Sequence, residues 1–133
     1  MDVILCLDDR NGMLFNHRRQ SRDRKVLEDI LQGLSGRLLR VRPMSQSLFP
    51  REAVLVEEEL LETAGPGDVC FVEDLPLAPC RKDIESLTVY RWNRHYPGDV
   101  FLDLDLSTGW RLVSREEFPG HSHEKITKEV YLP

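Results

Sequence analysis

Apolar runs and amphipathic stretches alternate along the first two thirds of the chain. Val3–Leu7 is an unbroken apolar run, which is typical of a strand buried on both faces of a sheet. A turn signal, Asp9–Gly12, follows it. Ser21 then stands where it can cap a helix of about 12 residues. The apolar face of that helix consists of Val26, Leu27, Ile30, Leu31 and Leu34.

The pattern continues with shorter elements of both kinds. It predicts strands over Arg37–Arg42, Ala53–Val56 and Val69–Val72. Short helices are predicted between them, over Ser45–Phe49, Glu57–Ala64 and Pro79–Ser86. Strands that alternate with helices favour a largely parallel sheet.

The last third of the chain leaves no room for helices. Strands are predicted over Leu87–Trp92, Val100–Leu106, Trp110–Ser114 and Lys125–Leu132. Apolar and acidic positions alternate within Val100–Leu106, as in an antiparallel strand with one wet face. The expected fold is therefore a single α/β domain over residues 1–133. Its mixed sheet is mainly parallel, with antiparallel C-terminal strands and helices on both faces.

Composition and charge narrow the class of protein. A net charge of -5 gives no global attraction to nucleic acid or anionic lipid. No apolar run approaches the ~20 residues of a membrane span, and Met1–Leu7 is too short for a signal peptide. Three unclustered cysteines, Cys6, Cys70 and Cys80, argue against a disulfide framework or a zinc site. A reducing, cytoplasmic location is expected.

The order of elements and several local residues resemble dihydrofolate reductase. That family opens with an apolar strand that runs into a polar turn with a glycine, here Val3–Gly12. Near the other end it has a strand, then Gly-Asp, an aromatic residue, and a tryptophan that opens the next strand. The matching residues here are Leu87–Tyr90, Gly98, Asp99, Phe101 and Trp110, with Phe118, His123 and Tyr131 extending the match loosely. The resemblance implies the reductase fold.

The cofactor motifs of that family are degenerate here. The family grips the phosphates of NADPH with Gly-Arg-x-Thr after its second strand; the arginine survives as Arg42, followed by Ser47, but the glycine and threonine do not. The family's Gly-Gly pair, where the backbone approaches the nicotinamide, is replaced by Glu73 and Asp74. Two carboxylates there face an anionic cofactor. NADPH remains possible by resemblance but is expected to bind poorly, and no other cofactor is implied.

Asp23 is the residue with the sharpest functional hypothesis. On an ideal helix it shares a face with Val26 and Ile30, so its carboxylate is expected to face a core or cleft, against Val3–Leu7 or Tyr90. Burial there suits it to proton transfer or to binding an amidine-like ring, as the substrate-binding acid of the resembled family does. The alternative is a first-turn carboxylate that complements the helix dipole.

A ligand site is predicted around Asp23 as the catalytic residue. Substrate contacts are expected from Asp8, at the C-terminal end of the first strand, from Arg19 in the segment His17–Asp23, and from Tyr90. Arg42 and Ser47 are the candidate cofactor contacts.

Two further patterns have ordinary explanations beside functional ones. The basic residues Arg18, Arg19, Arg22, Arg24 and Lys25 surround a helix start, where an anion, RNA or an acidic protein can bind; a solvated face is the commoner explanation. His121-Ser122-His123-Glu124 lacks the further ligands of a metallohydrolase and is interpreted as a polar hairpin turn. No metal site is predicted.

Three functions follow as hypotheses. The first is a divergent protein of the dihydrofolate reductase fold without efficient reductase activity, binding a small ligand or a partner. The second is a working NADPH-dependent reductase with an unusual cofactor site. The third is an interaction module that uses its basic surface at 17–25.

Overall fold

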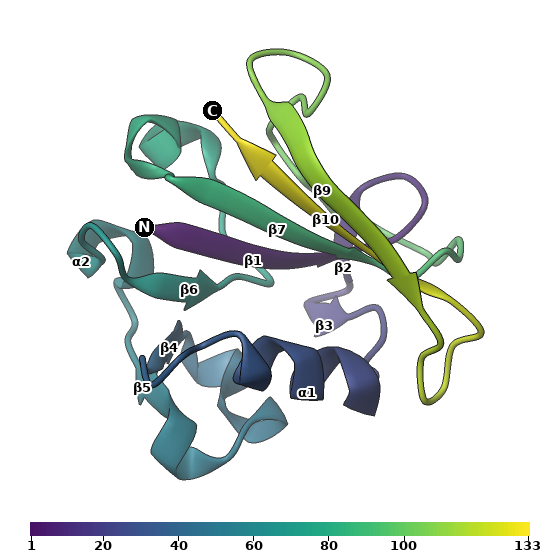
Figure 1. Ribbon diagram of the computed structural model, residues 1–133, viewed down its shortest axis with the longest axis horizontal. Helices are drawn as coiled ribbons and strands as arrows, with labels where there is room; N and C mark the ends of the chain where they lie inside the picture. Colours follow the sequence, from purple (N-terminus) through teal and green to yellow (C-terminus); the bar gives the residue numbers. More distant parts are fainter.

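A seven-stranded sheet forms the centre of the molecule in the computed structural model, which describes residues 1–133 (Figure 1). Its strands lie in the order β5-β4-β6-β1-β7-β10-β9. Their bounds are β1 Asp2–Leu7, β4 Leu39–Val41, β5 Val54–Val56, β6 Val69–Phe71, β7 Ser86–Arg91, β9 Arg111–Phe118 and β10 Ile126–Leu132. A second, three-stranded sheet contains β3 Arg18–Arg19, β2 Gly12–Phe15 and β8 Val100–Phe101.

The strand directions confirm the mixed sheet that the sequence predicts. β1 pairs in parallel with β6 and β7, and β4 pairs in parallel with β5 and β6. β10 runs antiparallel to both β7 and β9. Parallel strands need crossover connections, and the short helical elements between β1 and β7 supply them.

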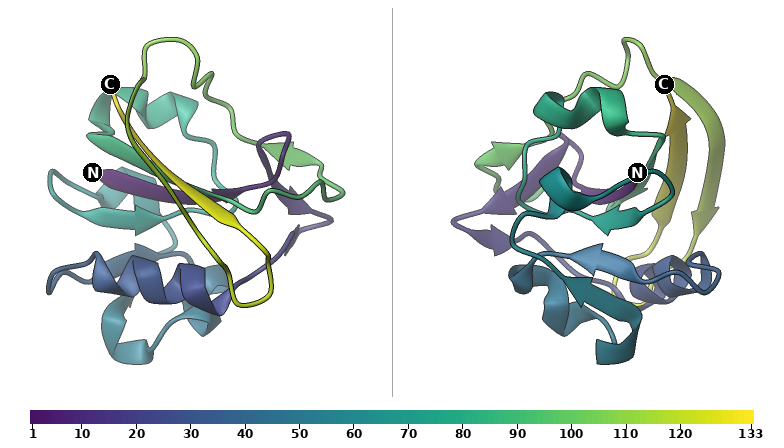
Figure 2. Two further views of the ribbon diagram at one scale, coloured as in Figure 1. Left: turned by 45° about the vertical axis from the view of Figure 1, so that its right-hand side comes forward. Right: turned by 90° about the vertical axis from the view of Figure 1, so that its left-hand side faces the viewer.

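Helices and loops cover both faces of the sheet (Figure 2). Helix α1, Arg24–Gln32, lies on one face, and the short α2, Leu60–Thr63, with the 3-10 helix Ala78–Asp83, lies on the other. Two further 3-10 segments, Pro43–Leu48 and Arg51–Ala53, link β4 to β5. This is the α/β arrangement expected from the alternating pattern.

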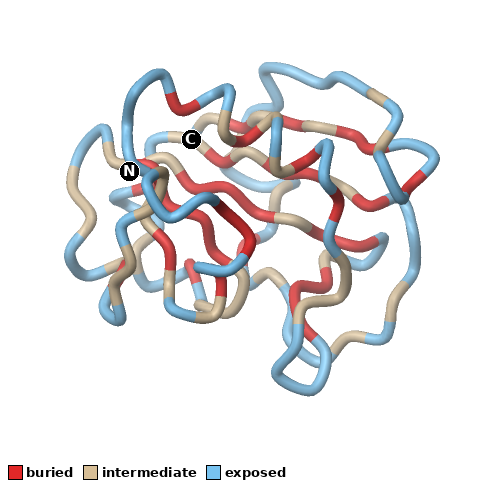
Figure 3. The backbone as a smooth tube through the Cα atoms, turned by 90° about the horizontal axis from the view of Figure 1, so that it is seen from below, coloured by how far each residue is buried: buried red, intermediate tan, exposed pale blue.

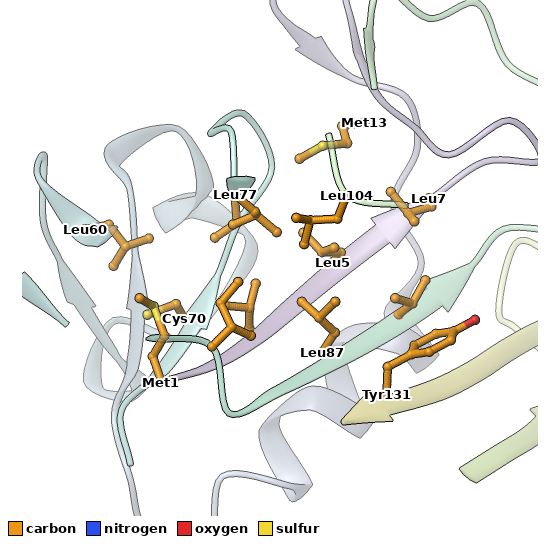
Figure 4. Close-up of a cluster of buried hydrophobic side chains, with 14 residues drawn as sticks. Met1, Leu5, Leu7, Met13, Leu60, Cys70, Leu77, Leu87, Leu104 and Tyr131 are labelled. Atoms are coloured by element: carbon orange, nitrogen blue, oxygen red, sulfur yellow. The ribbon is translucent and has the colours of Figure 1, made fainter. Parts of the chain in front are cut away.

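The alternation of side chains along β1 divides the interior into two cores. Val3, Leu5 and Leu7 point into the cluster that also holds Leu60 and Leu77 (Figure 4). Ile4 points the other way, into a cluster with the buried face of α1. The buried stretches of the chain accordingly follow the central strands, with exposed loops around them (Figure 3). β1 is thus buried on both faces, as its unbroken apolar run predicts.

Three local predictions were wrong, and two short strands were missed. Helix α1 spans 9 residues, and Asp23, not Ser21, caps it. Only Val100–Phe101 of the predicted strand Val100–Leu106 pairs with another strand; the rest is loop, although Leu104 is buried. The short β2 and β3 were not predicted. The turn that connects them has positive φ angles at Asn16 (52°) and His17 (62°). Glycine is the usual signal for such angles, and neither position is a glycine.

No helix of the structure is both long and apolar enough to cross a bilayer.

Candidate functional site

The C-terminal ends of the parallel strands meet at one edge of the sheet. Asp8 follows β1, Arg42 follows β4, and Glu73 comes shortly after β6. Helix α1 also begins near this edge, and the turn between β9 and β10 reaches the start of α1 (Figure 1). Open α/β sheets usually bind ligands at this edge, so its polar side chains form the candidate site.

Asp23 is buried, with 2% of its surface exposed, but it lies outside the helix. Its backbone is extended (φ -150°, ψ 129°), so the spacing of an ideal helix does not place its side chain. The carboxylate caps α1 by accepting the Lys25 amide at 2.8 Å. It also accepts the amides of His121 and Ser122, both at 2.9 Å. The buried carboxylate therefore faces the turn before β10 instead of Val3–Leu7 or Tyr90.

These hydrogen bonds keep Asp23 ionised. Burial alone would raise its pKa, because it disfavours the charged form. The backbone amide of His121, the imidazole of His123 and the amides of Ser122 and Lys25 outweigh burial, and they hold the pKa of Asp23 well below its ordinary value.

His123 connects Asp23 to two hydroxyl groups. Its Nδ1 lies 2.9 Å from Asp23 Oδ2, and its Nε2 lies 2.9 Å from Ser21 Oγ and 3.1 Å from the Tyr96 hydroxyl. The imidazole is buried and stacks on Trp92, with ring centroids 4.7 Å apart and an interplanar angle of 23°. The packing and the hydrogen bonds together fix the orientation of the ring.

The protons of this network follow from its donors and acceptors. Because Asp23 is a carboxylate, Nδ1 of His123 carries the proton of that hydrogen bond. In the tautomer with its single proton on Nδ1, Nε2 is an acceptor, and Ser21 donates to it. The Tyr96 hydroxyl lies 3.1 Å from the same Nε2 and 3.4 Å from Ser21 Oγ. The result is a chain of hydrogen bonds from Ser21 through His123 to Asp23, with the Tyr96 hydroxyl beside its first two members.

Asp8 is also buried, and its carboxylate holds two loops together. It accepts the amides of Arg10 at 2.9 Å and Gly12 at 2.7 Å, and the amide of Tyr96 at 3.1 Å. Burial opposes ionisation, but these amides, with Gly12 foremost, lower the pKa of Asp8 below its ordinary value. Asp8 thus fixes the backbone of the segment that carries Tyr96.

Arg19 crosses the strand ends to reach Glu73. Its guanidinium makes two hydrogen bonds of 2.9 Å to the two carboxylate oxygens, and it donates to the Met44 carbonyl at 2.7 Å. Ser45 adds a hydrogen bond of 2.7 Å to Glu73. The hydrogen bond to Glu73 raises the pKa of Arg19, in keeping with a bidentate charged pair.

Arg42 forms a similar pair with Asp74. It donates to Asp74 Oδ2 at 3.1 and 3.3 Å and to the Glu58 carbonyl at 2.9 Å. The bond to Asp74 raises the pKa of Arg42. Ser47, the other candidate cofactor contact, is exposed on the 3-10 segment after β4.

The structure does not bring Tyr90 into this group. Its hydroxyl donates to Asp29 within helix α1 at 2.6 Å, and the ammonium of Lys128 lies 5.6 Å from its ring centroid. Burial, followed by the hydrogen bond to Asp29, raises the pKa of Tyr90 above its ordinary value. Tyr90 joins α1 to β7 and lines a separate hollow beside the helix.

A cavity of about 290 Å³ opens beside the Ser21–His123 network. Its walls include Gln20, which precedes Ser21 in the chain, and Tyr96, which contacts Ser21 and His123. Arg18 and Arg19 also line it, so its charged groups are basic. A second cavity, of about 270 Å³, lies beside Arg42 and is lined by Glu58, Glu59 and Glu62.

Sequence reasoning missed three members of the network. Ser21 was assigned to the helix cap, His123 to a hairpin turn, and Tyr96 to no role. Asp23 and His123 are 100 positions apart in the sequence, and Ser21 and His123 are 102 apart. No local motif links residues at such separations. The only local feature that pointed to His123 was the polar run His121–Glu124. In the structure, no group of three potential metal ligands forms.

Comparison with known proteins identifies the fold. No protein-family model matches the chain, and no curated protein matches it by sequence. The structure is similar to that of dihydrofolate reductase from Enterococcus faecalis complexed with NADP(H) and RAB-propyl, with a TM-score of 0.70. The match covers 98% of this chain and 94% of that chain at 15% sequence identity. The chain therefore has a divergent dihydrofolate-reductase-like fold, as the sequence resemblance predicts.

Proposed function

We propose that this chain is a protein of the dihydrofolate reductase fold without efficient NADPH-dependent reductase activity, which binds a small anionic ligand in the cavity beside Arg18 and Tyr96. A fold shared at 15% identity does not carry an activity with it, so the proposal rests on the residues at the sheet edge.

One observation carries the first half of the proposal. Glu73 and Asp74 stand after β6, where the resembled family has its glycine pair, and each is held by an arginine of this chain. A bound cofactor would have to displace these ion pairs. The cavity beside Arg42 adds three glutamates, which repel the phosphates of the cofactor. The residues at this edge do not fit NADPH.

Calorimetric titration with NADPH tests this half. We expect a dissociation constant of roughly 1 mM or weaker, about -4 kcal/mol. The double variant Glu73→Gly, Asp74→Gly frees both arginines and should bind NADPH at least about tenfold more tightly, a gain of about 1.4 kcal/mol. Micromolar affinity in the unaltered protein would overturn the proposal in favour of a working reductase.

The second half rests on the basic cavity. Arg18 is exposed at its rim, whereas Arg19 is already paired with Glu73, so Arg18 supplies the free charge. Tyr96 adds a hydroxyl and an aromatic edge. A carboxylate or phosphate group of a small molecule is the ligand chemistry that suits a guanidinium beside hydroxyl donors.

Two-dimensional ¹H–¹⁵N NMR with inorganic phosphate and with succinate tests the ligand site. Shift changes should concentrate on the backbone amides of residues 16–20 and 96, and Arg18→Ala should reduce them. The matched control is Arg51→Ala, which removes an exposed arginine outside the cavity. Shifts spread evenly over basic surface residues, or none at millimolar anion, would contradict the proposed site.

A further inference from the structure

The Ser21–His123–Asp23 network has the order of groups that acyl transfer requires. A serine hydroxyl is a weak nucleophile until a base removes its proton, and the base works best when a third group fixes its orientation. Here Ser21 Oγ lies 2.9 Å from Nε2 of His123, and Nδ1 lies 2.9 Å from Asp23. The three residues come from the segment before α1 and from the turn before β10.

We propose that Ser21 is the nucleophile of an acyl-transfer site that hydrolyses small activated esters or thioesters bearing a negative charge. The negative charge of the substrate rests on the proposed function, because Arg18 of the proposed ligand site would bind it. The assignment of Ser21 as nucleophile depends neither on that ligand site nor on whether the protein binds NADPH.

The reaction proceeds in two balanced steps. Ser21 Oγ attacks the acyl carbon while its proton moves to Nε2 of His123, and the bond to the alcohol or thiol leaving group then breaks. The leaving group takes the proton from Nε2, which leaves an acylated Ser21. Water repeats the sequence: its proton passes to Nε2, its oxygen binds the acyl carbon, and the acid departs as the proton returns to Ser21 Oγ. No redox step or further co-reactant is needed.

Asp23 acts through His123 as a positioning residue. Its carboxylate holds the Nδ1 proton and is itself fixed by three backbone amides. The stacking of His123 on Trp92 keeps the ring in one orientation. The carboxylate also stabilises the imidazolium that forms when the serine loses its proton.

Tyr96 supplies a hydroxyl donor next to the nucleophile. A donor 3.4 Å from the attacking oxygen can reach the carbonyl oxygen of a bound ester as that oxygen becomes negative. Tyr96 lines the cavity that Arg18 also lines, and Ser21 follows the lining residue Gln20 in the chain. Ser21 is half-buried, whereas His123 and Asp23 are buried. Ser21 is thus the most exposed of the three residues Ser21, His123 and Asp23.

Covalent labelling tests the nucleophile directly. The full chain is incubated with a fluorophosphonate probe, and intact-mass and peptide mass spectrometry locate the adduct. We expect one adduct, on Ser21, and none in Ser21→Ala. His123→Gln should slow labelling about 10²-fold or more, because the base is lost. Ser114→Ala is the matched control, since Ser114 is an exposed serine of β9 outside the network.

Turnover and NMR separate the roles of the other groups. Hydrolysis of p-nitrophenyl hemisuccinate should exceed that of p-nitrophenyl acetate, and Arg18→Ala should abolish only that difference. Tyr96→Phe should lower kcat about 10²-fold with little change in KM if its hydroxyl stabilises the developing charge. Asp23→Asn should remove the downfield Nδ1 proton resonance of His123, which a merely structural carboxylate elsewhere would not do.

Unlabelled Ser21 in a folded protein would overturn the inference, as would equal hydrolysis by the unaltered protein and Ser21→Ala. If His123→Gln fails to fold, Ser21→Ala and Tyr96→Phe still decide, because each removes one oxygen atom. If the probe labels Ser21 but phosphate and succinate cause no shift changes in the titration, only the proposed anionic ligand site is contradicted.

Discussion

At the scale of single residues, this chain uses buried carboxylates as organisers of its loops. Asp23 collects backbone amides from the start of α1 and from the turn before β10, segments about a hundred residues apart. Asp8 does the same for the turn after β1 and the segment around Tyr96. A carboxylate is suited to this work because it accepts several hydrogen bonds and offers no donor of its own. An amide cannot replace it without turning a donor toward other donors.

The first prediction concerns Asp23→Asn. The amide of asparagine offers one acceptor oxygen and turns an NH₂ group toward the amides or the His123 proton. Hydrogen bonds to charged groups contribute about 1.5–3 kcal/mol each, and more than one weakens here. We expect a loss of at least about 2 kcal/mol in the free energy of unfolding at pH 7, measured by urea denaturation. A loss below 1 kcal/mol would reduce Asp23 to a complement of the helix dipole.

The pH dependence of this loss has a definite sign. The pKa of Asp23 is lower in the folded protein than in the unfolded chain, where it is about 3.9. Its contribution to stability is therefore complete above that unfolded value and is lost as pH falls toward the folded pKa. The difference between the unaltered protein and Asp23→Asn should shrink below about pH 4. A difference that stayed constant between pH 7 and pH 2 would refute the linkage.

The second prediction concerns the pair Arg19–Glu73. The pair is bidentate and only partly exposed, with side-chain exposures of 24% and 9%. Glu73→Gln, Arg19→Met and the double variant form a thermodynamic cycle measured by urea unfolding. We expect a coupling energy of about 1.5–3 kcal/mol, because removing either partner leaves the other charge half-buried. The exposed pair Arg115–Glu117, with exposures of 54% and 38%, is the control and should couple by less than about 1 kcal/mol.

At the scale of elements, burial decided which predictions succeeded. β1 and α1 carry strong apolar patterns because each buries a face in a core, and both were found. β3 contains only Arg18 and Arg19, so it has no apolar pattern to detect. Leu102, Leu104 and Leu106 contact the core from a loop that pairs with no strand, and their alternation imitated a strand.

The third prediction compares two glycines that lie near the two ends of helix α1. A Cβ atom at Gly120, in the turn before β10, would lie 2.7 Å from Asp23 Oδ2 and 2.8 Å from the His123 carbonyl oxygen. Gly33, at the end of α1, has a helical φ of -77°, and its nearest contacts would be 3.6 Å away. Gly120→Ala should cost about 1–3 kcal/mol through overpacking. Gly33→Ala should be neutral or stabilise by up to about 1 kcal/mol.

Thermal and urea unfolding of both alanine variants measure these effects. Gly120→Ala should also broaden or shift the NMR resonances of His123, because the added methyl group displaces the turn that holds the imidazole. If Gly120→Ala proved as harmless as Gly33→Ala, the turn would be loosely packed. That result would contradict the fixed orientation of His123 between Ser21 and Asp23.

At the scale of the whole molecule, the fold was predictable and the site was only partly so. The order of elements and the segment from Leu87 to Trp110 indicated the reductase fold, which the structural comparison confirms at 15% identity. Asp23 was singled out by its place near an apolar helix face. Its partners His123 and Ser21 depend on how β10 returns to the start of α1, and that long-range packing leaves no periodic signal in the sequence.

The last prediction concerns the basic surface around the start of α1. Arg19 is paired with Glu73, and Lys25 Nζ lies 3.8 Å from Glu28 Oε2. Arg18, Arg22 and Arg24 are exposed and form no ion pair. Three exposed arginines on a chain of net charge -5 give a short-range attraction only. Binding of single-stranded RNA at physiological salt should therefore be weaker than about 10⁻⁴ M. Any binding at low salt should weaken with a log–log slope no steeper than about -2, the value for three phosphates.

Gel-shift and fluorescence titrations over a range of salt concentrations measure this slope. The triple variant Arg18→Gln, Arg22→Gln, Arg24→Gln should abolish the residual low-salt binding, while Arg51→Gln, a single exposed arginine elsewhere, should leave it nearly unchanged. Tight binding that persists as salt rises would require base stacking or hydrogen bonds beyond phosphate contacts. Residues 18–20 also line the cavity beside Tyr96, so RNA bound there would occupy the proposed ligand site. That outcome would favour an interaction module over a protein that binds a small ligand.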